Sequence, residues 1–264
     1  MGRRRLDAEL VRRGLAASRS QAQEAVIAGR VTVAGITATK AASLVADGAH
    51  VALSGPPPSF VSRGGGKLAA ALDRFAVAPD GRDCLDAGAS TGGFTDCLLQ
   101  RGAARVVAVD VGYGQLSWGL RMDPRVTVME RTNVRDLTSS MLAFVPDLLV
   151  ADLSFISLRL VLPVLARVGG PEATFVVLVK PQFEAGRGYV GRGGVVRDPD
   201  VWRSVLSGVM AAARSASLEP LNVMASPLPG PAGNVEFPLH LIAGSPPSGV
   251  DLDGALREGE ALLR

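Results

Sequence analysis

The chain has 264 residues, 47% of them hydrophobic and 20% charged, and a formal net charge of +3 at pH 7. This is the composition of a soluble globular protein, long enough for one sizeable core and a small additional module. No apolar run approaches the roughly 20 residues of a membrane-spanning helix, and the basic N-terminus has no apolar stretch behind it, so no secretory signal is expected.

Charge is distributed unevenly along the chain. Residues 1–67 contain ten Lys or Arg and four Asp or Glu, whereas residues 68–264 contain eighteen and twenty-one. A basic head on a slightly acidic body suggests a polyanion-binding module joined to an enzyme. A solvated helix face with a basic tip would give the same counts, so the charge alone leaves both interpretations open.

The two cysteines, Cys84 and Cys97, have neither disulfide-framework nor metal-ligand spacing. We expect inert thiols in a reducing compartment, which favours a cytoplasmic protein. No metal requirement is expected.

The first part of the chain predicts two helices followed by short strands. Residues 6–13 have apolar side chains at helical spacing before Gly14, and a second helical pattern ends at Gly29. Residues 30–35 and 50–53 read as strands. The order helix, helix, strand predicts a small α+β module.

Arginines on these helices make the module similar to the S4-type RNA-binding domain, over roughly residues 5–54. In that domain paired helices lay basic side chains along RNA phosphates, and RNA helices are recognised largely by shape. The resemblance implies these phosphate-contacting candidates: Arg4, Arg5, Arg12, Arg13, Arg19 and Arg30.

Residues 54–66, SGPPPSFVSRGGG, predict a connection between domains, stiff in its proline-rich half and loose in its glycine-rich half. We therefore predict an S4-like domain over residues 1–59, an interdomain linker over 60–66 and a second domain over 67–264.

The second domain alternates helical and apolar strand patterns. Apolar strands that alternate with helices indicate an α/β fold with a mainly parallel sheet covered on both faces, and ligands bind such sheets at the carboxyl ends of the strands. The predicted strands are residues 83–88, 105–112, 126–130, 147–153, 174–180, 221–226 and 234–242. Helices are predicted over residues 67–76, 95–102 and 202–216.

A glycine-rich turn, LDAGASTGGF at residues 85–94, follows the first of these strands. Its spacing does not fit the nicotinamide fingerprint, but it is similar to the first motif of S-adenosylmethionine-dependent methyltransferases. Asp110 ends the second strand, where it can accept hydrogen bonds from two ribose hydroxyls. The resemblance implies that Asp136 lies near the adenine amine. The complete set of cofactor-binding candidates is Asp86, Gly88, Ala89, Ser90, Thr91, Gly92, Gly93, Phe94, Asp110 and Asp136.

Four residues in separate motifs, Lys67, Asp152, Lys180 and Glu236, are candidates for one catalytic site. Their order resembles that of FtsJ-like 2′-O-ribose methyltransferases. A ribose hydroxyl reacts only while its proton is leaving, so a base must stand within hydrogen-bond reach. The resemblance implies that Lys180 is this base and that Asp152 orients it. Lys67 and Glu236 would then position the hydroxyl.

The sequence Asp-Leu-Ser-Phe at residues 152–155 lacks the two prolines typical of enzymes that methylate exocyclic base amines, which favours ribose over base. Phe155 could stack on a flipped-out base or belong to the core. Residues 184–198 are too glycine-rich for regular structure and predict a mobile lid, with Arg187 and Arg192 available to RNA phosphates.

Nearly the whole chain resembles the TlyA family, the hemolysin A-type ribosomal RNA methyltransferases. The similar segments include VSRGG, LDAGASTGGFT, VDVGYGQL, ERTNVR, VKPQFE and GGVVRD. The resemblance implies cytidine 2′-O-methylation in 16S and 23S ribosomal RNA of the 30S and 50S subunits, with a link to antibiotic susceptibility. Family members usually carry a tryptophan next to a valine in the linker, whereas here Phe60 precedes Val61.

Three rival functions remain at this level. A membrane-active hemolysin would need amphipathic or membrane-spanning segments, which the sequence does not offer. A catalytically inactive RNA-binding protein is disfavoured by the intact set of two lysines and two acids. A base methyltransferase remains the chemical runner-up.

Overall fold

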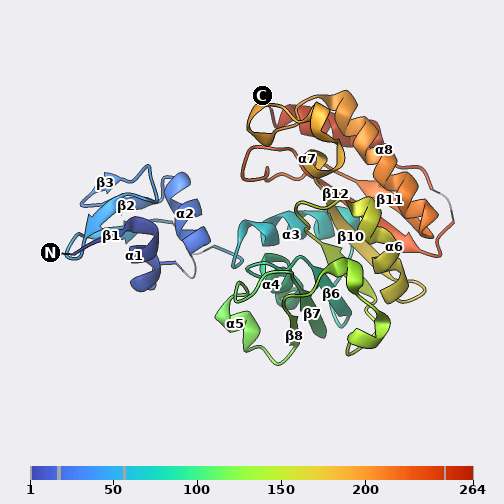
Figure 1. Ribbon diagram of the computed structural model, residues 1–264, viewed down its shortest axis with the longest axis horizontal. Helices are drawn as coiled ribbons and strands as arrows, with labels where there is room; N and C mark the ends of the chain where they lie inside the picture. The colour runs from blue at the N-terminus through green and yellow to red at the C-terminus, as the bar shows by residue number, and fades with distance from the viewer. Residues whose placement is uncertain (1, 17–18, 56–57, 247, 264) are drawn as a thin grey trace. The chain divides into compact units, whose positions relative to one another are not determined.

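The computed structural model of the protein describes residues 2–16, 19–55, 58–246 and 248–263 (Figure 1). The chain divides into two compact units, Met1–Ser62 and Arg63–Arg264.

The described residues of the N-terminal unit form two helices and two small antiparallel sheets, one pairing β1 with β4 and one of order β3-β2-β5. Leu6, Leu10 and Val31 are fully buried in its core. The elements are β1 (Arg3–Arg5), α1 (Leu6–Arg12), α2 (Arg19–Ile27), β2 (Val31–Val33), β3 (Ile36–Thr37), β4 (Leu44–Ala46) and β5 (Val51–Leu53). Sequence patterning predicted β2 and β5 but missed β1, β3 and β4; β1 consists of three arginines and therefore shows no apolar alternation.

The glycine-rich half of the predicted linker is helical, so the prediction of a loose segment at residues 64–66 is wrong. Helix α3 (Arg63–Phe75) begins before these glycines. Gly65 is buried, and a Cβ atom on Gly66 would lie 2.9 Å from Leu228 Cδ1. Close packing of this first turn therefore favours residues without side chains, and the packed apolar face of α3 outweighs the low helix propensity of glycine.

The second unit is built on a seven-stranded sheet of order β11-β12-β10-β9-β6-β7-β8. Neighbouring strands from β10 to β8 are parallel, whereas β12 runs antiparallel to both β10 and β11. The strands are β6 (Asp83–Ala87), β7 (Arg105–Val109), β8 (Val126–Met129), β9 (Leu148–Ala151), β10 (Thr174–Val179), β11 (Leu218–Val223) and β12 (Phe237–Ala243). The predicted fold class, a mainly parallel seven-stranded α/β sheet, is confirmed.

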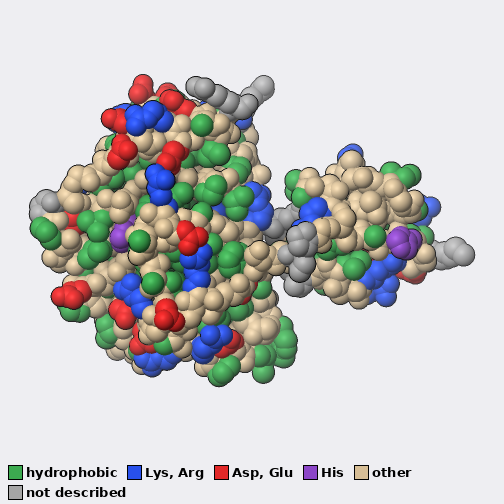
Figure 2. Space-filling view, turned by 180° about the vertical axis from the view of Figure 1, so that it is seen from behind, with side chains coloured by type: hydrophobic (Ala, Val, Ile, Leu, Met, Phe, Trp, Pro, Cys, Tyr) green, Lys and Arg blue, Asp and Glu red, His purple; other side chains and the backbone are tan. Residues whose placement is uncertain are grey.

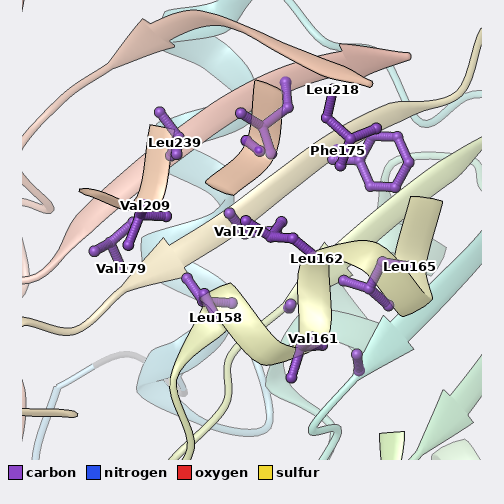
Figure 3. Close-up of a cluster of buried hydrophobic side chains, with 14 of the residues drawn as sticks. Leu158, Val161, Leu162, Leu165, Phe175, Val177, Val179, Val209, Leu218 and Leu239 are labelled. Carbon is purple, nitrogen blue, oxygen red and sulfur yellow. The ribbon is translucent and has the colours of Figure 1, made fainter. Parts of the chain in front are cut away.

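Helices lie on both sides of this sheet (Figure 1). Alternate residues of each strand point to opposite faces, and one set, including Phe175, Val177 and Val179, packs with α6 and α8 (Figure 3). Helices α3 and α4 contact each other, as do α6 and α8. The remaining helices are α4 (Gly93–Gln100), α5 (Trp118–Arg121), α6 (Leu158–Val168), α7 (Pro181–Glu184), α8 (Pro199–Ser215) and α9 (Leu252–Ala261).

This topology determines where polar side chains meet. Strands β6, β7, β9 and β10 are parallel and end at one edge of the sheet. Strand β12 starts at that same edge, because Phe237, its first residue, pairs with Val179, the last residue of β10. The first residues beyond these strand ends therefore lie together at one edge of the sheet; they are residues 88, 110, 152, 180 and 236.

Two leucines on α6 provide a test of the core. Leu162 is fully buried against the sheet, whereas Leu160 is 59% exposed. Leu162→Ala should lower the free energy of unfolding by about 2–5 kcal/mol because it leaves a cavity. Leu160→Ala, the matched control, should change it by less than about 0.5 kcal/mol. Urea unfolding followed by circular dichroism measures both, and equal effects would contradict this description of α6.

Candidate active site

Asp152 and Lys180 lie in direct contact where β9 and β10 end. Lys180 Nζ is 2.6 Å from Asp152 Oδ1, an ion contact whose angles fall outside hydrogen-bond geometry. The same amine donates to Ser154 Oγ at 3.0 Å. The side chains of Lys180 and Asp152 are 11% and 23% exposed, so this pair is accessible to a ligand without being fully solvated. Sequence reasoning missed Ser154, although it lies inside the singled-out motif.

Lys67 and Glu236 form a second, more deeply buried pair. Lys67 Nζ donates to Glu236 Oε2 at 2.5 Å, and their side chains are only 8% and 2% exposed. Lys67 belongs to α3, and Glu236 immediately precedes β12. The pair therefore connects the first helix of this unit to the strand next to β10, one position along the sheet from Lys180.

The loop before Glu236 fits closely around its carboxylate. A Cβ atom on Gly230 would lie 2.5 Å from Glu236 Oε1, so this site excludes larger residues. Asn234 is buried and bridges to a distant segment, accepting from Val196 N and donating to Gly194 O, each at 2.9 Å. The C-terminal end of the glycine-rich segment is thus fixed beside Glu236.

A pocket of about 710 Å³ opens at the ends of β6, β7 and β9, within the size range of small-molecule sites. Its lining includes Gly88, Ser90, Asp110, Asn133, Asp152 and Phe155. Asp110 is held by two backbone donors: Ser90 N donates to Oδ2 at 2.8 Å and Gly112 N to Oδ1 at 2.6 Å. Each carboxylate oxygen retains acceptor capacity toward the pocket.

Two glycines of the turn are required by packing within the protein. A Cβ atom on Gly88 would lie 2.6 Å from the Asp152 carbonyl oxygen, and one on Gly92 would lie 2.2 Å from Leu120 Cδ1. Both residues have positive φ angles, which favour glycine. The turn therefore packs tightly against the end of β9 and against α5, in addition to bordering the pocket.

Asp86 is fully buried inside β6. Its Oδ2 atom accepts from Thr95 Oγ1 at 2.7 Å, whereas Oδ1 has no hydrogen-bond partner among the described residues. Burial raises the pKa of the Asp86 carboxyl to about 7, with the neighbouring Asp152 and Asp110 carboxylates adding to the shift. Asp86 does not line the pocket, so its assignment to the cofactor rests on the sequence motif alone.

The other cofactor candidates occupy different positions. Ala89, with Ser90 and Asp110, borders a small hollow that adjoins the pocket. Thr91 O accepts from Ser117 N, Gly92 caps α4, and Gly93 and Phe94 are buried in its first turn. Asp136 is exposed and does not line the pocket, whereas its neighbours Asn133, Val134 and Arg135 do.

Phe155 projects from the loop that follows β9. It is 91% exposed and has a φ angle of +64°, unusual for a bulky residue. Its ring centroid is 5.0 Å from that of Phe183, whose ring lies 5.9 Å from Lys180 Nζ. The interpretation of Phe155 as a core residue is wrong, because the strained turn directs its side chain outward.

In the N-terminal unit, five of the six candidate arginines surround two buried acids. Asp7 pairs with Arg5 and Arg19, while Glu9 pairs with Arg4, Arg12 and Arg13, at 2.6–3.3 Å. Hydrogen bonds from Arg12 and then Arg13 lower the pKa of the Glu9 carboxyl to about 2. Arg30 donates to Ser54 O at 2.9 Å. Figure 2 shows Lys and Arg side chains, in blue, on one face of this unit.

The glycine-rich segment 184–198 contains two short turns, Arg187–Tyr189 and Arg192–Gly194, separated by extended backbone. Tyr189 is 66% exposed. The side chains of Arg187 and Arg192 lie outside the described part of the structure.

Among the described residues, none of the helices combines the length and apolarity needed to cross a membrane. The same residues contain no group of three His, Cys, Asp or Glu arranged to hold a metal ion.

The seven-stranded sheet has the fold of S-adenosylmethionine-dependent methyltransferases. It matches one from Listeria monocytogenes with a TM-score of 0.52 and 14% identity, covering 69% of this chain and all of that one. Residues 60–242 match the family model of FtsJ-like methyltransferases, and residues 4–51 match that of the S4 domain.

Over 240 residues the chain is 55% identical to the 16S/23S rRNA (cytidine-2′-O)-methyltransferase TlyA of Mycobacterium tuberculosis, covering 90% of each protein. A solved structure from Streptococcus thermophilus that carries the name hemolysin is 40% identical, with a TM-score of 0.78 over 99% of this chain and 95% of that one. The chain is an enzyme of the methyltransferase class. It belongs to the TlyA family of FtsJ-like methyltransferases with an N-terminal S4 domain, as the sequence motifs predict.

The two lysine–carboxylate pairs should respond differently to removal of the amine. Lys67→Met leaves Glu236 buried without a partner and should lower the free energy of unfolding by about 3–5 kcal/mol. Lys180→Met should cost less, because Asp152 is partly exposed. Denaturant unfolding tests this, and Lys67→Met/Glu236→Gln should recover part of the loss. Equal losses for the two single variants would contradict the difference in burial.

Asp86 should make stability depend on pH. Its pKa is raised from an ordinary 3.8 to about 7, so between those values the folded state binds a proton that the unfolded state has released. The free energy of unfolding of the wild type therefore falls as pH rises through that window. Asp86→Asn should gain stability relative to wild type from pH 4 to pH 8, measured by urea unfolding. A difference that is constant with pH would contradict the raised pKa.

Proposed function

We propose that the chain methylates the 2′-hydroxyl of a cytidine ribose in 16S and 23S ribosomal RNA, using S-adenosylmethionine. The observation that carries the proposal is the meeting of two lysine–carboxylate pairs at the edge of the sheet that also borders the pocket. S-adenosylmethionine supplies, when bound, an activated methyl group on a sulfonium.

Lys180 is the base in this proposal. The ribose hydroxyl must lose its proton as its oxygen attacks, and the Lys180 amine, after releasing a proton of its own to solvent, is the nitrogen beside the pocket that takes it. Asp152 and Ser154 hold that amine through the contacts at 2.6 and 3.0 Å. The proton then passes from the amine to solvent.

Lys67 and Glu236 have a positioning part in the same reaction. Their pair is buried and enclosed by the loop around Gly230, so it provides a fixed donor and acceptor for orienting the hydroxyl. Orientation of the attacking oxygen in line with the transferred group contributes much of the rate in such reactions.

The residues around the pocket fit S-adenosylmethionine. Asp110 would accept from the ribose hydroxyls of the cofactor, with its side chain already fixed by Ser90 N and Gly112 N. The backbone of the turn from Gly88 to Ser90 would hold polar groups of the methionine part. For the adenine, the lining residues Asn133 and Val134 are better placed than Asp136.

RNA contacts are assigned to both units. The buried Asp7 and Glu9 hold the guanidinium groups of five arginines in place, which suits contact with a phosphate backbone. Phe155 is exposed beside the pocket and would stack on the flipped-out base. Arg187 and Arg192 remain candidates by sequence alone.

The choice of rRNA rests on the similarity to the mycobacterial enzyme, whose name states its 16S and 23S substrates. Action on ribosomal RNA also places the proposed activity in the cytoplasm. The hemolysin name of another relative would predict leakage of dye from lipid vesicles, and we expect none from this chain.

Labelled-methyl transfer to 30S subunits, 50S subunits and naked rRNA tests the proposal. We expect transfer to both subunits, at a ribose 2′-oxygen of cytidine, as mapped by mass spectrometry of nucleosides. Lys180→Met should reduce the rate by at least about 100-fold. Absence of transfer from the wild type would indicate an RNA-binding protein, and methyl groups on bases would indicate the base-modifying rival.

A further inference from the structure

The two loops that carry Lys180 and Asp152 are joined twice. One link is the Lys180 amine, which reaches Asp152 and Ser154. The other is Glu184, at the end of the single-turn helix α7 that follows Lys180. Its Oε2 atom accepts from Ser157 Oγ and its Oε1 atom from Leu158 N, both at 2.6 Å.

Glu184 lies in an environment built to hold it. Its side chain is only 1% exposed, and Arg159 Nε is 3.7 Å from Oε2. Burial raises the pKa of the Glu184 carboxyl. Ser157 and Leu158 begin α6, whose first backbone N–H groups lack partners within the helix, so the carboxylate satisfies one of them.

The loop between these links is strained. Phe155 has a φ angle of +64°, and such conformations cost about 1–3 kcal/mol unless their surroundings enforce them. Lys180 bonds to this loop just before Phe155, at Ser154, and Glu184 bonds to it just after Phe155, at Ser157. The hydrogen bond from Lys180 depends on a flexible side chain and on the amine that gains and loses a proton in the proposed reaction. The hydrogen bonds to Glu184 do not involve that amine.

We propose that Glu184 is a positioning residue for methyl transfer: it fixes the loop of residues 152–158 against Lys180 and keeps Phe155 directed outward. This rests on the proposed function, because the reaction defines what is positioned. None of the described contacts of Glu184 is with Lys67, Asp152, Lys180 or Glu236. Glu184 therefore acts through Ser157 and Leu158.

Glu184→Ala, Glu184→Gln and Glu219→Ala form a matched series. Glutamine can accept from Leu158 N with its carbonyl and donate to Ser157 Oγ with its amide, so it preserves both links. Glu219 is also a buried glutamate, accepting from Ser248 N at 3.0 Å and pairing with Arg214. It lies at the opposite end of the sheet, because Ile242, its partner in β12, also pairs with Thr174 at the start of β10.

Glu184→Ala should lower the single-turnover rate of methyl transfer to rRNA subunits by about 10- to 100-fold, with the Kd for S-adenosylmethionine within about threefold of wild type. Glu184→Gln should recover to within about threefold of wild type. Hydrogen exchange of residues 153–158 should accelerate in Glu184→Ala, a change that a loss of global stability alone would not confine to this loop. Glu219→Ala should lower the melting temperature without slowing transfer by the folded protein.

Unchanged transfer and exchange in Glu184→Ala, beside an active wild type, would overturn the inference and leave the proposed function intact. Equal slowing by Glu184→Ala and Glu219→Ala would also overturn it, since both would then act only through stability. A wild type that transfers no methyl group would instead refute the proposed function. Accelerated exchange in Glu184→Ala would, even then, support the structural link between the loops.

Discussion

The buried pair of Lys67 and Glu236 is the contact on which the geometry of the site depends. Removing two charges from water costs several kcal/mol per ion, and only close approach with well-formed hydrogen bonds offsets that cost. The protein therefore has to bring α3 and the start of β12 together accurately, although 169 residues separate the two side chains. Once they are fixed, Lys180 is fixed as well, because it directly follows β10, the strand that pairs with β12.

The N-terminal unit also contains buried charged groups, and the surface around them is positively charged. There two acids are fully buried and the arginines around them remain partly exposed. The acids hold the guanidinium groups in place and leave an excess of positive charge at the surface. In the methyltransferase unit both partners of each pair are largely enclosed, which suits positioning of reacting groups, whereas the arginine cluster suits contact with a polyanion.

The loops at the edge of the sheet are fixed mainly by side chains that bond to backbone. Asp110 accepts from Gly112 N and Ser90 N, Glu184 from Leu158 N, and Asn234 bridges Val196 N and Gly194 O. Such bonds satisfy backbone groups that loops cannot pair by themselves. They also attach the glycine-rich segment 184–198 to its surroundings at its start, through Glu184, and near its end, through Gly194 and Val196.

Sequence alone determined the α/β class, the parallel strands and the family, because apolar periodicity and short motifs are local properties. It also selected Lys67, Asp152, Lys180 and Glu236 as a set. Only the tertiary structure decided how deeply each lysine–acid pair is buried, that Asp136 lies outside the pocket lining, and that glycines 64–66 are helical. Asp7, Glu9, Ser154 and Glu184 were missed for the same physical reason: their importance comes from burial and from partners across space, and no local pattern in a single chain encodes either.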